Sequence, residues 1–215
     1  MKKYIYSGAT LLVLVLAAYI LGWSTLFTVS SIEIKGTQLS VKSLIAPGEK
    51  LARVEPRAVI AQYEKIDWVK SVDISRNWFS GKVTISLVER SPIAIYKDRA
   101  IDADGVSFAL KDLGTGKADN LPHIQAPTVE SAVRASMFFI TLPIEITQEV
   151  RWVKVRSADA YLLEIMKGSR AIEVLWGQDQ ENPLKAKVYQ ALMAREENQQ
   201  IRRIDLTAPH APIVM

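Results

Sequence analysis

The sequence contains no cysteine among its 215 residues. Without cysteine a chain can form neither a disulfide framework nor a lipid anchor on a cysteine side chain, and thiolate chemistry is excluded. Any domain that this chain places outside the cytoplasm must therefore be held together by its hydrophobic core.

Histidine is also scarce, and other metal-binding or catalytic patterns are missing. Only His123 and His210 occur, each next to a proline, and neither has a second ligand at helical or hairpin spacing. Asp102-x-Asp104-Gly105 matches the start of a calcium-binding loop, but the further carboxylates are missing and a hairpin turn explains it. The sequence lacks the Gly-x-Ser-x-Gly, phosphate-loop and dinucleotide motifs. We therefore expect no metal, no cofactor and no enzymatic activity.

A large excess of one charge is absent as well. The formal net charge is +4 and the sequence pI is about 9.2. Once Lys2 and Lys3 are set aside, 25 basic residues remain against 23 acidic ones, and no basic run occurs. This balance argues against a nucleic-acid partner.

What the sequence does have is an uncharged stretch between Lys3 and Glu33. A spanning helix needs about 20 mostly apolar residues, and residues 4–27 supply that length, so we predict one transmembrane helix there and a cytoplasmic tail over residues 1–3. The positive charges of Lys2 and Lys3 favour a cytoplasmic amino terminus, with the rest of the chain outside the cell membrane. Trp23 is expected in the headgroup layer, and the apolar centre is formed by Leu11, Leu12, Val13, Leu14, Val15 and Leu16.

A cleaved signal peptide is the alternative interpretation of this stretch. Cleavage requires small residues in an Ala-x-Ala pattern, but Ala17-Ala18-Tyr19 places a tyrosine at the second small position. Gly22-Trp23-Ser24 matches the pattern only marginally. The sequence favours an uncleaved anchor.

The residues after the anchor predict a small module of strands and helices. A short strand ends at Gly36, and two helices follow, one capped by Ser40 and one that begins at Pro56. Two further strands alternate apolar and polar residues, with apolar positions Val72, Ile74, Val83, Ile85 and Leu87. The expected order is β-α-α-β-β over about 60 residues, with both helices packed on one face of the sheet. Val83, Ile85 and Leu87 should face those helices.

The module contains a recognisable set of residues in a fixed order: Phe27, Val29, Ile32, Ile34, Gly36, Trp68, Val69, Val72, Arg76, Trp78, Val88, Glu89, Arg90, Pro92 and Ala94. This order resembles the FtsQ/DivIB family of bacterial division proteins. In that family the module is called a POTRA domain, which the resemblance implies for residues 28–90. Many members have proline after the position of Trp78, where this chain has Phe79.

The second half predicts a mainly antiparallel β-domain with flanking helices over residues 91–206, so the fold class is α+β. Two runs, Ile93–Tyr96 and Val106–Leu110, flank an Asp104-Gly105 turn with Ile101 between them. The other expected elements are a helix over about Thr128–Ile140 that buries Val129, Val133 and Met137 or their neighbours, a meander of Trp152–Val155, Tyr161–Met166 and Ile172–Trp176, a helix from Pro183 to about Glu196, and a strand over Ile201–Leu206. Trp176-Gly177, Lys185 and Ile204-Asp205-Leu206 resemble the β-domain of FtsQ-like proteins.

The resemblance implies a non-enzymatic scaffold of the cell-division machinery at the septum. Such proteins bind the small coiled-coil proteins FtsB/DivIC and FtsL and help to control septal peptidoglycan synthesis. A terminal strand often lies at a sheet edge, so we expect partner binding at Ile201, Arg203, Ile204, Asp205, Leu206 and Thr207. The alternative is an internal strand followed by a disordered tail, residues 207–215, that contains Pro209 and Pro212.

Two other functions and two local alternatives remain open. A membrane-anchored envelope hydrolase would use Asp102, Asp104 or Glu89 as paired acid and base, but no motif supports it. A POTRA module for outer-membrane assembly usually accompanies repeats or a barrel, and this chain has neither. Glu89-Arg90-Ser91-Pro92 fits a hinge better than a partner contact. Core packing is favoured over a binding surface for Trp68, Trp78, Trp152 and Trp176.

Overall fold

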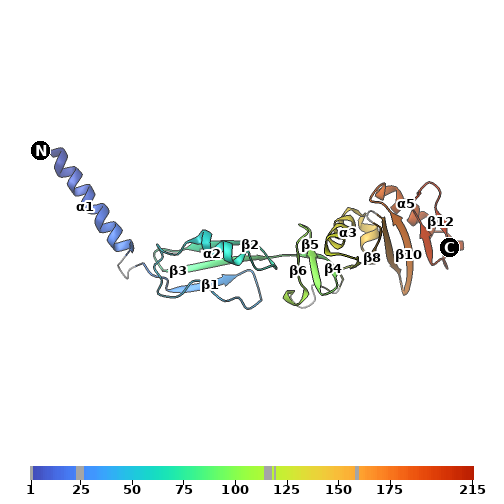
Figure 1. Ribbon diagram of the computed structural model, residues 1–215, viewed down its shortest axis with the longest axis horizontal. Coiled ribbons are helices and arrows are strands. Elements are labelled where there is room, and N and C mark those ends of the chain that lie inside the picture. Colours follow the sequence, from blue (N-terminus) through green and yellow to red (C-terminus); the bar gives the residue numbers. More distant parts are fainter. Residues whose placement is uncertain (1, 23–26, 114–117, 119, 158–159) are drawn as a thin grey trace. The chain divides into compact units, whose positions relative to one another are not determined.

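The computed structural model describes residues 2–22, 27–113, 118, 120–157 and 160–215 (Figure 1). The chain divides into two compact units, Met1–Arg90 and Ser91–Met215. Each unit is described below by itself.

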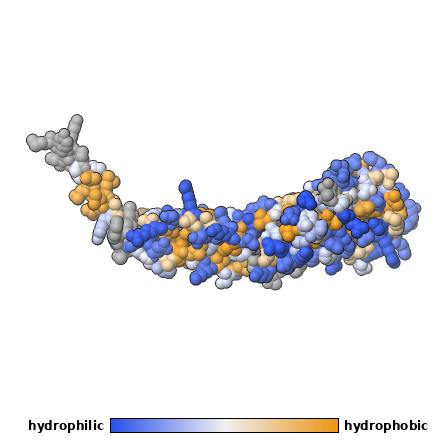
Figure 2. Space-filling view, in the orientation of Figure 1, coloured by the Kyte–Doolittle hydropathy of each residue, from blue (hydrophilic) through white to orange (hydrophobic). Residues whose placement is uncertain are grey.

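The first helix, α1 (Lys2–Gly22), is formed by the apolar run near the amino terminus. The side chains of Leu11 to Leu16 are exposed, and the described part of this helix is hydrophobic in Figure 2. None of the helices, as far as their residues are described, is both long enough and apolar enough to cross a membrane. Trp23 lies outside the described residues.

The first unit contains a three-stranded sheet of β1 (Ser31–Lys35), β2 (Val69–Arg76) and β3 (Lys82–Glu89). The order is β1-β3-β2, with β3 parallel to β1 and antiparallel to β2. One helix, α2 (Pro56–Tyr63), contacts β2 and begins with Pro56 in its first turn, as predicted.

The predicted register of β3 is confirmed. Val83, Ile85 and Leu87 are buried, whereas Lys82 and Val88 are exposed on the opposite face. Ile85 lies between Ile34 of β1 and Ile74 of β2, so a row of three isoleucines crosses the sheet on its covered face. The strict alternation in the sequence was sufficient to fix this arrangement, because a slip of one residue would expose all three apolar side chains.

The helix predicted to begin at Ser40 is wrong. Residues 40–46 are irregular, so the described elements of this unit after α1 have the order β-α-β-β. The hydroxyl of Tyr63 accepts a hydrogen bond from Leu44 N (3.1 Å) and donates one to Lys42 O (3.1 Å). Ser43 Oγ accepts another from Ile45 N (3.2 Å). A helix of only about six residues is marginal, and these side-chain partners offer its backbone an alternative.

The second unit is built on one sheet of nine described strands in the order β12-β11-β10-β9-β8-β7-β4-β5-β6. Their bounds are β4 (Pro92–Tyr96), β5 (Arg99–Asp102), β6 (Ser107–Ala109), β7 (His123–Gln125), β8 (Val150–Ser157), β9 (Ala160–Lys167), β10 (Arg170–Gly177), β11 (Arg203–Asp205) and β12 (Ile213–Val214). Neighbouring pairs are antiparallel except β4 with β7, β7 with β8, and β10 with β11, which are parallel. The predicted Asp104-Gly105 turn joins β5 to β6, and β8, β9 and β10 form the predicted meander.

Helices cover one face of this sheet. They are α3 (Val129–Thr141), α4 (Ile144–Thr147) and α5 (Asn182–Met193), with 3-10 turns η1 (Leu110–Asp112) and η2 (Glu196–Asn198). The start of α3 is fixed by a capping box between Thr128 and Ser131. Its buried face contains Ala132, Ala135 and Phe138, the neighbours of the predicted positions, while Val129 is exposed. Phe138 stacks on Tyr161 of β9 with ring centroids 4.1 Å apart.

A buried polar cluster ties β10 to α5 and to the end of α3. Trp176 Nε1 donates to Asn182 Oδ1 at 2.8 Å, and Asn182 Nδ2 donates to Thr141 Oγ1 and to Asp179 Oδ1. Buried polar groups are stabilising only when they are paired, and here the indole and the amide satisfy each other. The cluster therefore fixes where α5 begins relative to the sheet.

Candidate partner-binding surface

The strand predicted as the partner site, β11, is not an edge strand. It lies between β10 and β12, so the prediction of a free edge there is wrong. Ile204 is opposite Val214 and Asp205 is opposite Ile213 in an antiparallel pair. Arg203 N donates to Met215 O (3.1 Å), and Met215 N donates to Arg203 O (3.0 Å). Of the alternative, an internal strand followed by a disordered tail, the internal strand is confirmed and the disordered tail is wrong, because the tail supplies β12.

A tight turn after β11 brings the tail back to the sheet. Asp205 Oδ1 accepts hydrogen bonds from Thr207 N (2.9 Å) and from Thr207 Oγ1 (2.7 Å). Ala211 N donates to Ala208 O (2.9 Å), and Pro209 is buried. These local contacts reverse the chain direction, so residues 213–215 lie antiparallel to β11.

The predicted partner-binding residues occupy different environments. Ile204 and Leu206 are fully buried in the core, so their side chains are unavailable to a partner. Ile201, Arg203 and Asp205 are half-buried, and only Thr207 is exposed. The side chains of these residues therefore contribute mainly to the packing of the fold and offer little surface to a partner.

The free edge at this end of the sheet is β12. Because Arg203 and Met215 exchange both backbone bonds, the alternation of antiparallel pairing directs the N–H and C=O of Val214 away from β11. Ile213, Val214 and Met215 have exposed fractions of 57%, 39% and 61%, so this edge is also apolar. Such an edge can template the addition of another strand. The sequence signal was a run of only three apolar residues, Ile213 to Met215, too short to be recognised as a strand.

The opposite end of the sheet is less accessible to an added strand. There the last strand is β6, and the guanidinium of Arg99 donates from Nη2 to Ser107 O at 2.6 Å and from Nε to Ser107 Oγ. A charged side chain that occupies an edge carbonyl blocks strand addition. Within the described residues, β12 is therefore the more accessible of the two ends.

Several residues of the recognised motif hold the first unit together. Gly36 has φ 86°, and a Cβ there would lie 1.9 Å from Leu87 O, so only glycine fits. Arg76 Nη1 donates to Leu51 O (3.0 Å) and Val54 O (2.8 Å), and its guanidinium lies 5.4 Å from the centroid of Trp78. These contacts account for the glycine and the arginine of the motif in structural terms.

The end of the motif joins β2 to β3. Trp68 and Val69 are buried, and Val69 lies opposite Glu89. Arg90 N donates to Trp68 O (2.9 Å), and Arg90 Nε donates to Asp67 O (3.1 Å). This segment closes the first unit just before Pro92, where β4 begins.

The aspartates and histidines considered above as catalytic or metal-binding candidates make structural contacts or lie in solvent. Asp102 is buried, and its Oδ1 accepts hydrogen bonds from Asp104 N (3.0 Å) and Val106 N (2.8 Å), which confirms the hairpin turn. His123 stacks on Trp152 at 4.8 Å, and His210 is exposed. Among the residues that the structure describes, no three acidic, histidine or cysteine side chains form a metal-binding group.

The helix α5 buries two titratable side chains. Burial lowers the pKa of Lys185, whose Nζ donates to Gln178 O at 2.9 Å. Burial, with the nearby charge of Glu149, raises the pKa of Tyr189 to about 12. Desolvation of the charged form is the largest cause of both shifts, and the raised pKa of Tyr189 keeps its hydroxyl protonated at neutral pH.

Comparison with known proteins agrees with this architecture. Residues 27–90 match the family described as POTRA domain, FtsQ-type, so the fold is that of a POTRA-containing protein. The chain is 27% identical over 208 residues to the cell division protein FtsQ of Streptomyces venezuelae, which covers 88% of this chain and 74% of that protein. It is 29% identical over 185 residues to FtsQ of Streptomyces coelicolor, covering 77% of this chain and 67% of that protein. The chain is thus similar to FtsQ proteins over most of its length and contains an FtsQ-type POTRA domain.

Proposed function

We propose that this chain is a non-enzymatic scaffold of the bacterial division machinery. It binds coiled-coil proteins of the FtsB/DivIC and FtsL types and through them helps to control septal peptidoglycan synthesis. The POTRA match and the similarity to proteins named for cell division support this proposal.

The amino-terminal segment anchors this scaffold in the cell membrane at the division septum. The proposed span is residues 4–27, with residues 1–3 in the cytoplasm and both folded units outside. Support comes from the uncharged run and from Lys2 and Lys3, which precede it. Confinement to one membrane raises the effective concentration of other tethered proteins, so each contact can be of modest affinity.

The observation that carries the partner assignment is the free edge of β12. An extended segment of the FtsB/DivIC-type partner adds to this edge through the outward N–H and C=O of Val214. Apolar side chains of the partner cover Ile213 and Met215, both largely exposed in the free chain. The partner surface thus lies on the tail rather than on Ile201 to Thr207.

The test is the capture of partners from membranes of the native host. The full chain, tagged at its amino terminus, is solubilised in mild detergent, and the membrane proteins that copurify are identified by mass spectrometry. We expect FtsB/DivIC-type and FtsL-type proteins in amounts close to that of the bait. A bait that is folded and abundant but brings down neither class contradicts the proposed scaffold role.

A further inference from the structure

The turn between β2 and β3 presents an aromatic side chain to its surroundings. Phe79 is fully exposed, at 102% of its reference area, which is unusual for phenylalanine. The turn, residues 77–81, contains no charged residue. Its shape is fixed by Asn77, whose Oδ1 accepts hydrogen bonds from Phe79 N (3.0 Å) and Ser80 N (3.1 Å). Phe79 is therefore held outward rather than left free to fold back.

This turn is fixed to residues 27–30, which directly precede β1. Ser30 N donates to Gly81 O (2.8 Å), and Ser30 Oγ donates to Ser80 O (2.6 Å). The ring of Phe27 meets the ring of Trp78 edge to face, with centroids 6.2 Å apart. The 77–81 turn and residues 27–30 thus form one rigid corner of the unit.

The approach of the two segments depends on a glycine. Gly81 has φ 72°, and a Cβ there would lie 2.4 Å from Thr28 O. Any other residue would push the turn away from residues 27–30. Gly81 therefore preserves both the turn and its contact with residues 27–30.

We propose that the 77–81 turn is a second membrane contact, in which Phe79 inserts into the interfacial layer of the lipid bilayer. The inference rests on the proposed membrane anchor, because the span of residues 4–27 ends at the residue that Trp78 contacts. Since Phe27 is the last residue of the proposed span and its ring contacts Trp78, the 77–81 turn lies at the bilayer surface.

The chemistry of the turn fits a lipid interface. Tryptophan is enriched at the boundary between headgroups and acyl chains, and phenylalanine rings of interfacial segments are buried there as well, so Trp78 and Phe79 both suit this layer. An uncharged turn avoids the cost of carrying a charge into that layer. Two contacts, the span and Phe79, would restrict how the POTRA unit tilts on the membrane.

The absence of cysteine allows a direct test with single labels on the full chain. Ser80→Cys places an environment-sensitive fluorophore such as NBD at the turn, and Leu14→Cys places it in the proposed span. Lys65→Cys is the matched control, since this exposed residue precedes β2, whose eight residues span about 26 Å. Each variant is reconstituted in vesicles of phosphatidylethanolamine and phosphatidylglycerol, with and without a nitroxide-labelled lipid as quencher.

We expect the label at position 80 to shift to the blue and to be quenched by the nitroxide lipid, while the label at 65 stays aqueous. Adding Phe79→Ser should remove both effects at position 80, and Phe79→Trp should retain them. Phe79 makes no core contact, so circular dichroism should show both variants folded.

The possible outcomes test the turn contact and the membrane anchor independently. A membrane-embedded label at 14 with an aqueous label at 80 overturns the turn contact and leaves the anchor standing. An aqueous label at 14 contradicts the anchor itself, and an aqueous label at 80 in the same vesicles contradicts the contact too. If the label at position 80 is shielded from water in native membranes but not in vesicles, a protein rather than lipid covers the turn. That result overturns the lipid contact.

Discussion

Val214 lies directly opposite Ile204 across the last antiparallel pair of the sheet. This pairing makes the tail part of the fold and moves the free edge from β11 to β12. It also changes which substitutions test the edge. Thr207 N already donates to Asp205 Oδ1, and the alternation of the pair directs Asp205 N toward Ile213. Proline at Asp205 or Thr207 would therefore damage the fold rather than only the interface.

Deleting residues 213–215 should lower the free energy of unfolding by about 1–2 kcal/mol, since three backbone hydrogen bonds between Met215 and residues 202–203 are lost. Urea denaturation followed by tryptophan fluorescence measures the change. His210→Ala, at an exposed position of the same tail, is the control and should be neutral. Identical midpoints for the truncated and full-length chains would show that β12 does not pair in solution.

Replacing Ile85 with Asp should cost more than about 3 kcal/mol, because a charge would be buried without a partner in the core of the first unit. Thr84→Asp, one residue earlier, lies on the opposite face and should cost less than about 1 kcal/mol, mainly from the like charge of Glu33 across the pair. Thermal unfolding of both variants gives the comparison. Equal losses would contradict the register of β3.

Asn182→Ala should lower the stability of the second unit by about 2–3 kcal/mol, because it leaves the buried indole N–H of Trp176 without an acceptor. Gln190→Ala on the exposed face of α5 is the control and should change stability little. Urea denaturation of both variants, followed by circular dichroism, tests this. A near-neutral Asn182→Ala would mean that water or another group replaces the amide.

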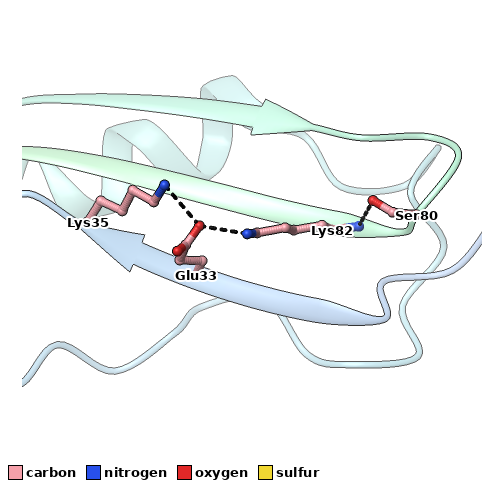
Figure 3. A network of polar contacts seen from close by, with 4 residues as sticks. All are labelled: Glu33, Lys35, Ser80 and Lys82. Carbon is pink, nitrogen blue, oxygen red and sulfur yellow. Dashed lines mark hydrogen bonds and ion pairs between the residues drawn. The ribbon is translucent and has the colours of Figure 1, made fainter.

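Acidification should weaken the ion pairs of Glu33. Its Oε2 lies 2.9 Å from Lys82 Nζ and 3.2 Å from Lys35 Nζ, as Figure 3 shows. The hydrogen bonds from Lys82 and then Lys35 lower the pKa of Glu33 below its ordinary value of 4.5. A carboxyl whose pKa is lower in the folded state stabilises the fold above the unfolded pKa and loses this effect as the pH falls through the folded pKa.

The check is the melting temperature of the native chain and of Glu33→Gln between pH 7 and pH 3. The native chain should be slightly more stable at neutral pH, and the difference should disappear in the acidic range. The effect is small because the pair is exposed to solvent. A difference that grows toward pH 3 would reverse the predicted sign.

Long alternating strands were predictable from the sequence, and short or context-dependent elements were not. Val83, Ile85 and Leu87 define a buried face by themselves, as do Ile172, Val174 and Trp176 of β10, because burial on one face requires period two. The segment after Ser40 has a helical pattern, yet Tyr63, distant in sequence, supplies partners to its backbone. Strand β12 has only two residues and exists because β11 offers a pairing edge, which no local pattern reveals.

The central claim, that a partner strand adds to β12, is tested most directly by the affinity of a purified FtsB/DivIC-type partner for the full chain and for Val214→Pro. Proline removes only an outward N–H, so the fold should persist while the dissociation constant rises about tenfold, the effect of one hydrogen bond of about 1.4 kcal/mol. Met215→Pro, which removes the N–H bonded to Arg203 O, is the control that should reduce stability. Unchanged affinity of a folded Val214→Pro chain would contradict the account.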